Sequence, residues 1–277
     1  MYDFRNTTQS AFPLENKVQM IINGVNLDEK ISGFRTLAVY GRELVSRNIS
    51  TTDYRRVKVG STMRSYANKA ASSTKSYDNK FLGATLSSRT LSVEYDLKAK
   101  NNKEFIEAFE ILNYYLDQEQ AEIIFTDDKN FFWVGTVSET EIPDVNNLWL
   151  KSSFEIECPN PFKTSINSEV LEFDTRGKLK KSTLYPVKLE RMKVKLRTSG
   201  DKLIIKNLNN AQSIILNAPF KTGDIFEIDF TNSNINKNLM QYLDMTSDLE
   251  EFEVLYNDEL HTSLPCDVGL MYREVRL

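Results

Sequence analysis

The stretch of sequence that decides the fold runs from Arg89 to Phe162 and reads RTLSVEYDLKAKNNKEFIEAFEILNYYLDQEQAEIIFTDDKNFFWVGTVSETEIPDVNNLWLKSSFEIECPNPF. Apolar and polar residues alternate from Leu91 to Leu97, which is the period of two that a half-buried strand requires. A helix opened by Asn101-Asn102 follows, and its apolar residues recur at spacings of three and four. These residues are Phe105, Ala108, Phe109, Leu112 and Leu116.

The second half of this stretch predicts a hairpin and a closing strand. Apolar runs at 122–125 and 131–134 are joined by the polar turn signal TDDKN. Alternation then resumes over 148–158 and stops at Pro159-Asn160-Pro161, because proline lacks the N–H that a sheet ladder needs. One helix among short antiparallel strands indicates an α+β domain, and the chain as a whole is expected to be mainly β.

The residues before this stretch fit the same domain. Alternation from Val18 to Ile22 leads to Asn23-Gly24, the strongest short-range hairpin signal, and a further strand is expected over 34–40. We therefore expect an N-terminal domain over residues 1–165.

A long basic excursion interrupts this domain at residues 51–89. It carries eight cations against two aspartates, and its centre is small and polar, so it has little to bury. Three interpretations stay open: a solvated loop, an arm that orders against a neighbouring subunit, and a nucleic-acid-binding arm. The acidic remainder of the chain makes the last the weakest. The candidate contact residues are Arg55, Arg56, Lys58, Arg64, Tyr66 and Tyr77.

Beyond Phe162 the pattern changes to short strands between turn signals, including Thr222-Gly223-Asp224. Strands are expected near 170–173, 185–197, 202–206, 213–216, 225–230, 252–256 and 270–275, with one helical turn at 239–243. Such a pattern indicates a β-sandwich or jelly roll over residues 166–277. Basic residues gather over 176–206 and acidic ones over 244–259, which fits either solvated faces or contact with a partner.

Length and composition agree with two globular domains. The chain has 277 residues, 40% of them hydrophobic, and a formal net charge of −4, which argues against general nucleic-acid affinity. The sequence lacks both a long apolar run and the features of a signal peptide. Cys158 and Cys266 are expected to be buried small hydrophobes rather than a disulfide pair. We expect a soluble protein made in a reducing compartment.

The sequence offers little catalytic chemistry. Its single histidine, His261, leaves one candidate base for any nucleophile, and no phosphate-binding or nucleophile-elbow motif is present. Acidic pairs that could hydrolyse glycosides occur at Asp127/Asp128, Glu139/Glu141 and Glu227/Asp229, but alternating acids on strands normally face solvent. We predict no catalytic residue, no metal site and no cofactor.

A carbohydrate-binding module is the alternative. Such modules stack a sugar ring on an exposed aromatic ring. Trp133 is expected in the core, while Trp149 could be either core or platform. The C-terminal part has no tryptophan, although Tyr185, Tyr242 or Tyr256 could substitute.

The layout resembles the distal tail proteins of long-tailed bacteriophages with non-contractile tails. The similarity covers residues 1 to about 165 best and is weaker beyond. It rests on the Asn23-Gly24 hairpin, the strand RTLSVEY at 89–95, the helix 105–116, the pair IIFTD at 123–127 and FWVG at 132–135, the ending FEIECPNP at 154–161 with Asn160-Pro161-Phe162 as its tail, and TGDIFEID at 222–229.

The resemblance implies a ring, usually a hexamer, at the tip of a phage tail. The N-terminal domains would form the ring, with the excursion reaching toward a neighbour, and the C-terminal domain would be a galectin-like docking sandwich. The implied partners are further copies of this chain, the tail tube protein, the tail-associated hub protein, and peripheral receptor-binding or baseplate proteins. Nucleic acid and membrane are not implied as partners, and no enzymatic activity is implied. The implied location is the virion, after synthesis in the bacterial cytoplasm.

Overall fold

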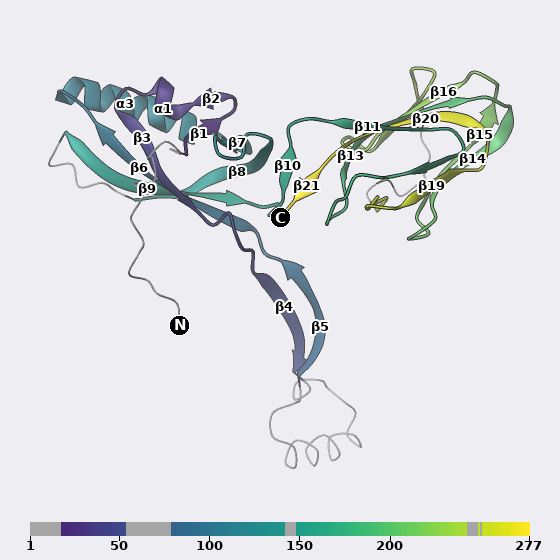
Figure 1. Ribbon diagram of the computed structural model, residues 1–277, viewed down its shortest axis with the longest axis horizontal. Helices are drawn as coiled ribbons and strands as arrows, with labels where there is room; N and C mark the ends of the chain where they lie inside the picture. The colour runs from purple at the N-terminus through teal and green to yellow at the C-terminus, as the bar shows by residue number, and fades with distance from the viewer. Residues whose placement is uncertain (1–17, 54–78, 142–147, 243–248, 250) are drawn as a thin grey trace, which may run out of the picture. The chain divides into compact units, whose positions relative to one another are not determined.

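The computed structural model describes residues 18–53, 79–141, 148–242, 249 and 251–277 (Figure 1). The chain forms two compact units. We call one the helix unit (Asp28–Ala121 and Gly135–Pro161) and the other the sandwich unit (Met1–Leu27, Glu122–Val134 and Phe162–Leu277). The domain boundary expected at residue 165 stays a prediction.

The helix unit contains antiparallel strands in the order β8-β9-β6-β3, and it includes β8 from Gly135 onward. Their bounds are Phe34–Tyr40 for β3, Arg89–Lys98 for β6, Phe131–Thr140 for β8 and Trp149–Cys158 for β9. Strand alternation buries Leu91, Val93, Tyr95 and Leu97 of β6, so the strand predicted from this alternation is confirmed.

Helix α3 (Asn102–Leu116) is the predicted helix, and α1 (Leu27–Lys30) is one short turn. The Asn101 side chain caps α3 by accepting a hydrogen bond from the Glu104 backbone N–H at 2.9 Å. Phe105, Ala108 and Leu112 are buried, as the spacing of three and four predicts.

A two-stranded ribbon also belongs to the helix unit. Strands β4 (Arg47–Asp53) and β5 (Asn79–Leu86) pair antiparallel, with Asp53 opposite Asn79 (Figure 1). Of the excursion predicted at 51–89, residues 51–53 end β4 and residues 79–86 form β5, while residues 54–78 lie outside the described part. Cross-strand hydrogen bonds satisfy the backbone there although the sequence alternates weakly.

The sandwich unit begins with the predicted Asn-Gly hairpin. Strands β1 (Met20–Ile22) and β2 (Val25–Asn26) flank Asn23 and Gly24, whose φ angles are 47° and 80°. Two consecutive positive φ angles define the turn that matches the twist of antiparallel strands. Strand β1 pairs antiparallel with β7 (Ala121–Phe125), and the strand order here is β2-β1-β7-β8.

Two short strands, β10 (Lys163–Ser165) and β21 (Val275–Arg276), join this sheet to the C-terminal sandwich. Strand β10 pairs antiparallel with both β8 and β21. The backbone N–H of Ser165 donates to the carbonyl of Glu274 at 2.8 Å. The segment between these residues therefore leaves β10 and returns to β21 at adjacent points.

The C-terminal sandwich consists of two antiparallel sheets, in the orders β11-β20-β13-β16-β17-β18 and β12-β19-β14-β15. One hydrophobic core draws residues from both sheets, such as Val194 and Leu270 from the first and Leu203 and Ile214 from the second. The bounds of the strands are Glu169–Phe173 (β11), Arg176–Lys178 (β12), Lys188–Leu196 (β13), Gly200–Asn207 (β14), Ser213–Phe220 (β15), Ile225–Asp229 (β16), Asn234–Lys237 (β17), Met240–Tyr242 (β18), Glu259–Thr262 (β19) and Cys266–Arg273 (β20). The mainly-β fold class is confirmed.

Two local predictions in the sandwich are wrong. Residues 252–256 do not form a strand, although Phe252 and Val254 are buried. Of the helical turn expected at 239–243, Leu239 lies in a turn and 240–242 form β18, while residue 243 lies outside the described part. Asn238 and Leu239 have φ angles of 48° and 69° and make a tight hairpin turn between β17 and β18.

The turn before β16 is fixed by Asp224. Its carboxylate accepts hydrogen bonds from the Lys221 backbone N–H at 2.9 Å and from Asn238 Nδ2 at 2.9 Å, and Lys237 Nζ lies at 3.1 Å. These hydrogen bonds, led by the one from Lys221, lower the pKa of Asp224 to about 2. The carboxylate therefore stabilises the turn in its ionised form.

We expect Asp224→Asn to remove a pH-dependent part of the stability. Because the folded pKa of Asp224 is depressed, its contribution is present above about pH 4 and is lost as the pH falls toward about 2. Denaturant unfolding should show a deficit of about 1 kcal/mol at pH 7, since solvent screens part of the interaction, and almost none near pH 2. Asp201→Asn, which alters an exposed residue near the start of β14, is the control. An equal deficit at both pH values would contradict the assignment.

Candidate interaction surfaces

Arg89 lies at the base of the β4–β5 ribbon, with 2% of its surface exposed. Its Nε donates to the Pro161 carbonyl at 2.9 Å, and its Nη1 donates to the Gly41 carbonyl at 2.6 Å. The guanidinium thus joins the start of β6 to the residues that follow β3 and β9. Arg89 is one of the eight cations of the basic excursion, but it is buried: two carbonyls accept from Nε and Nη1, while its buried Nη2 makes no hydrogen bond within the described part.

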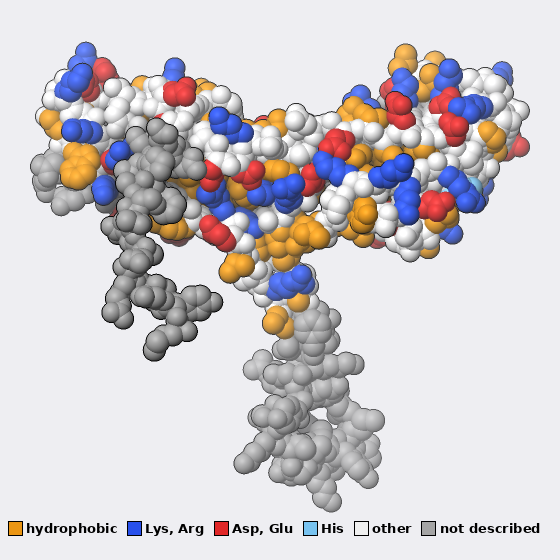
Figure 2. Space-filling model, in the orientation of Figure 1, with side chains coloured by type: hydrophobic (Ala, Val, Ile, Leu, Met, Phe, Trp, Pro, Cys, Tyr) orange, Lys and Arg blue, Asp and Glu red, His pale blue; other side chains and the backbone are white. Residues whose placement is uncertain are grey.

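Exposed apolar side chains surround the point where the ribbon begins. Tyr40 is 52% exposed, Leu44 89% and Ile49 66%. Figure 2 shows hydrophobic side chains where the described part of the ribbon begins. Exposed apolar clusters of this kind are typical of protein-binding surfaces. The six predicted contact residues lie outside the part of the chain that the structure describes: Arg55, Arg56, Lys58, Arg64, Tyr66 and Tyr77.

The acidic pairs considered for glycoside hydrolysis have structural contacts. Asp128 pairs with Lys163 at 2.6 Å, and Glu227 lies 3.6 Å from Lys193. Glu141 accepts a hydrogen bond from Ser153 Oγ at 3.2 Å. Hydrogen bonds from the Asn232 side chain and nearby backbone N–H groups outweigh desolvation and lower the pKa of Asp229. The lowered pKa of Asp229 does not suit it to be the protonated acid that glycoside hydrolysis needs.

The two cysteines are free and fully buried, as predicted. Burial raises the pKa of the Cys158 thiol to about 12 and also raises that of Cys266, so neither thiol is activated as a nucleophile. His261 lies on β19, in the sheet opposite the one that contains Cys266. Within the described ranges, no group of three or more potential ligands could hold a metal ion.

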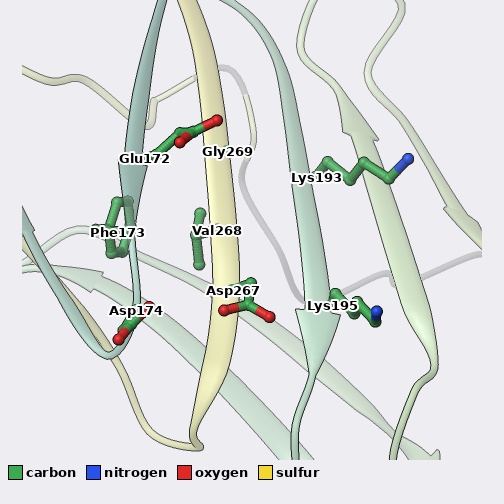
Figure 3. Close-up of a pocket in the computed structure, with 8 residues that line it drawn as sticks. All are labelled: Glu172, Phe173, Asp174, Lys193, Lys195, Asp267, Val268 and Gly269. Carbon is green, nitrogen blue, oxygen red and sulfur yellow. The ribbon is translucent and has the colours of Figure 1, made fainter.

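A groove of about 500 Å³ crosses the outer face of the six-stranded sheet (Figure 3). Gly269 pairs with Glu172 on one side and Lys193 on the other, and its missing side chain opens the floor. Figure 3 shows Lys193 and Lys195 on one strand, across from the carboxylates of Glu172, Asp174 and Asp267. The groove presents charges of both signs and no exposed aromatic ring, which suits a polar protein contact better than a sugar.

The two tryptophans have different environments. Trp133 is 1% exposed and packs against Phe125, with ring centroids 5.8 Å apart, so its prediction as a core residue is confirmed. Trp149 is 53% exposed. Of the substitute tyrosines, Tyr185 packs edge-on against Phe162 at 4.9 Å and Tyr256 is 43% exposed. The side chain of Tyr242 is outside the described part.

A network of charges links the first and last strands of the sandwich. Lys181 contacts Glu169 and also lies 3.0 Å from Glu274, and Glu274 accepts a hydrogen bond from Arg276 at 2.6 Å. Burial would raise the pKa of Glu274, but the hydrogen bonds from Arg276 and Lys181 outweigh it and hold that pKa below its usual range. The Tyr272 hydroxyl donates to Glu169 at 3.0 Å. These contacts therefore hold the first strand of the sandwich, β11, against the residues at the end of the chain segment that forms it.

Among solved structures, the chain is similar to proteins of phage adsorption and baseplate assemblies. The Dit protein of phage SPP1, described as a paradigm of the hub adsorption apparatus of phages that infect Gram-positive bacteria, matches with a TM-score of 0.70 at 15% identity. This match covers 94% of the present chain and 99% of the Dit chain. The chain therefore has the Dit fold, and the predicted fold resemblance is confirmed.

Two further matches have lower scores. Chains from structures of the phage P2 baseplate in its activated conformation, with Ca and with Sr, have TM-scores of 0.45 and 0.44 at 5% and 6% identity. Each match covers 93% of the present chain and 97% of the other. No family model matches the sequence, and no curated protein matches it.

Proposed function

We propose that the protein is a structural component of a phage tail tip, where it forms a homohexameric ring. The observation that carries this proposal is the similarity to the SPP1 Dit protein over nearly the whole of both chains. A match of that extent includes both the helix-bearing part and the sandwich, rather than one common module. Fold alone does not define function, so the surfaces must supply the rest of the argument.

The ribbon and its apolar base support a ring. A closed ring needs two different surfaces that complement each other on neighbouring copies. The ribbon supplies paired backbone that reaches residues 53 and 79, and the exposed side chains of Tyr40, Leu44 and Ile49 supply apolar area next to it. We place the contact with the neighbouring copy on residues 54–78 together with this base.

The ring would join the tail tube protein to the tail-associated hub protein, and the C-terminal sandwich would hold receptor-binding or baseplate proteins. The charged groove over Gly269 is the docking surface that we assign to such partners. The protein would act without enzymatic activity or a cofactor, in the virion, after synthesis in the bacterial cytoplasm. No helix in the described part is long and apolar enough to cross a membrane.

Oligomeric state tests the proposal. Native mass spectrometry of the full chain at micromolar concentration should show a hexamer, either alone or after addition of the tail tube protein of the same phage. Negative-stain images should then show rings. A monomer under both conditions would contradict a ring-forming role, whatever the fold.

A further inference from the structure

The exposed Trp149 lies beside a pocket at the end of the helix unit's sheet. Trp149 is the first residue of β9, and the pocket has a volume of about 680 Å³, within the range of small-ligand sites. Besides the backbone of β3 and β6, charged side chains form its walls. The lining residues are Gly33, Phe34, Arg35, Asp96, Lys98 and Trp149.

The register of three strands brings these side chains to one face. Lys98 is opposite Trp149, and Asp96 is opposite both Arg35 and Lys151. Residues two apart on a strand point to the same side, so one face presents an indole with cations next to it. The position of Gly33 is constrained as well. Its φ is +79°, and a Cβ there would lie 1.9 Å from the Lys98 carbonyl oxygen. A larger residue would therefore push the backbone of Lys98, which lines the pocket, out of place.

The pocket has a positive balance of charge. Two of the lining residues, Arg35 and Lys98, are cations, and one, Asp96, is a carboxylate. Lys151, paired opposite Asp96, adds a third cation beside the pocket. Asp96 binds Arg35 bidentately, with Nε–Oδ1 at 3.2 Å and Nη2–Oδ2 at 2.7 Å, and this contact fixes the guanidinium while its side chain stays 48% exposed. Lys151 Nζ lies 5.9 Å from the centroid of the Trp149 ring.

We infer that this pocket binds an anionic saccharide. The exposed indole offers one flat apolar surface of the size of a sugar ring, whose C–H groups pack on aromatic faces. The remaining donors of Arg35 suit hydroxyl groups, and Lys98 suits a carboxylate or phosphate on the sugar. An acidic peptide would need further apolar pockets for its anchors, and Phe34, the other ring here, is only 4% exposed. This inference does not depend on ring formation.

Calorimetric titration of the full chain with trigalacturonic acid tests the site. We expect saturable binding at low salt that weakens as salt screens the cations. Trp149→Ala should weaken it about tenfold, and Lys98→Gln about threefold, since an exposed charge contributes less than an aromatic platform. Tyr114→Ala and Lys103→Gln alter similarly exposed residues of α3 and should leave the affinity within about twofold. Circular dichroism would verify that each variant folds.

Other probes decide the ligand class. Maltotriose, which is neutral, should bind at least about fivefold more weakly if the cations contribute. Equal affinity for maltotriose would overturn the anionic character of the ligand. Triglutamate or a thymidine oligonucleotide that binds as tightly as trigalacturonic acid, with the same loss in Trp149→Ala, would overturn the saccharide assignment. Absence of saturable heat with trigalacturonic acid would overturn the site itself.

Discussion

Replacing Arg89 with methionine should lower the free energy of unfolding by about 3 kcal/mol. Methionine keeps the apolar stem but leaves the Pro161 and Gly41 carbonyls without the donors they now have, and each lost buried hydrogen bond costs about 1–3 kcal/mol. Pro161 is buried, so water cannot readily replace the guanidinium there.

Urea unfolding followed by circular dichroism measures this effect. The control is Lys98→Met, an exposed residue at the other end of the same strand, for which we expect a change within about 0.5 kcal/mol. The loss of unfolding free energy in Arg89→Lys should lie between the losses in Arg89→Met and Lys98→Met. An ammonium group keeps the charge, but it cannot donate to both carbonyls as the rigid guanidinium does. Equal stability of Arg89→Met and wild type would show that the guanidinium is not required at the ribbon's base.

Replacing residues 54–78 with a short turn should strongly weaken assembly while the protein remains folded. Asp53 and Asn79 are directly paired, so Asn-Gly can replace residues 54–78 as a two-residue hairpin turn. Loop-closure entropy changes little with loop length, so the melting temperature should stay within a few degrees. A loss of about 3 kcal/mol would weaken each subunit contact about a hundredfold, and the losses multiply over the contacts of a closed ring.

Analytical ultracentrifugation across a concentration series measures how far the variant without residues 54–78 assembles compared with wild type. A full-length variant with Arg55, Arg56, Lys58 and Arg64 replaced by glutamine separates the role of charge from that of the segment itself. If the shortened protein assembles as well as wild type, the neighbour-binding assignment of the excursion fails. If the shortened protein unfolds, the segment belongs to the core of the helix unit.

Local patterns in the sequence predict much of the fold. The Asn23-Gly24 hairpin, β3 and α3 depend on contacts within a few residues, such as positive φ angles, alternation and the Asn101 cap. The sandwich can also be predicted from the sequence, because its buried residues alternate along strands of ordinary length, as in β13.

Features that depend on distant partners are not visible in the sequence. Arg89 looks like a surface cation, and only its contacts with residues 48 and 72 positions away show that it is buried. Strand β5 alternates weakly and is formed by its pairing with β4. The surroundings of Trp149 are set by the pairing of three strands. The exposure of its side chain therefore cannot be predicted from the residues next to it in the sequence.

The adjacency of Ser165 and Glu274 makes residues 166–273 an exchangeable cassette. Both cuts that would excise this segment fall at one hydrogen-bonded point, so the short pair β10–β21 can be kept while the insert changes. Any domain whose own ends lie close together could occupy the same place without altering the pairing of β10 with β8. Evolution can thus diversify what the protein presents at this position while conserving the sheet that carries it, and a designer can graft a reporter or binder there by the same two cuts.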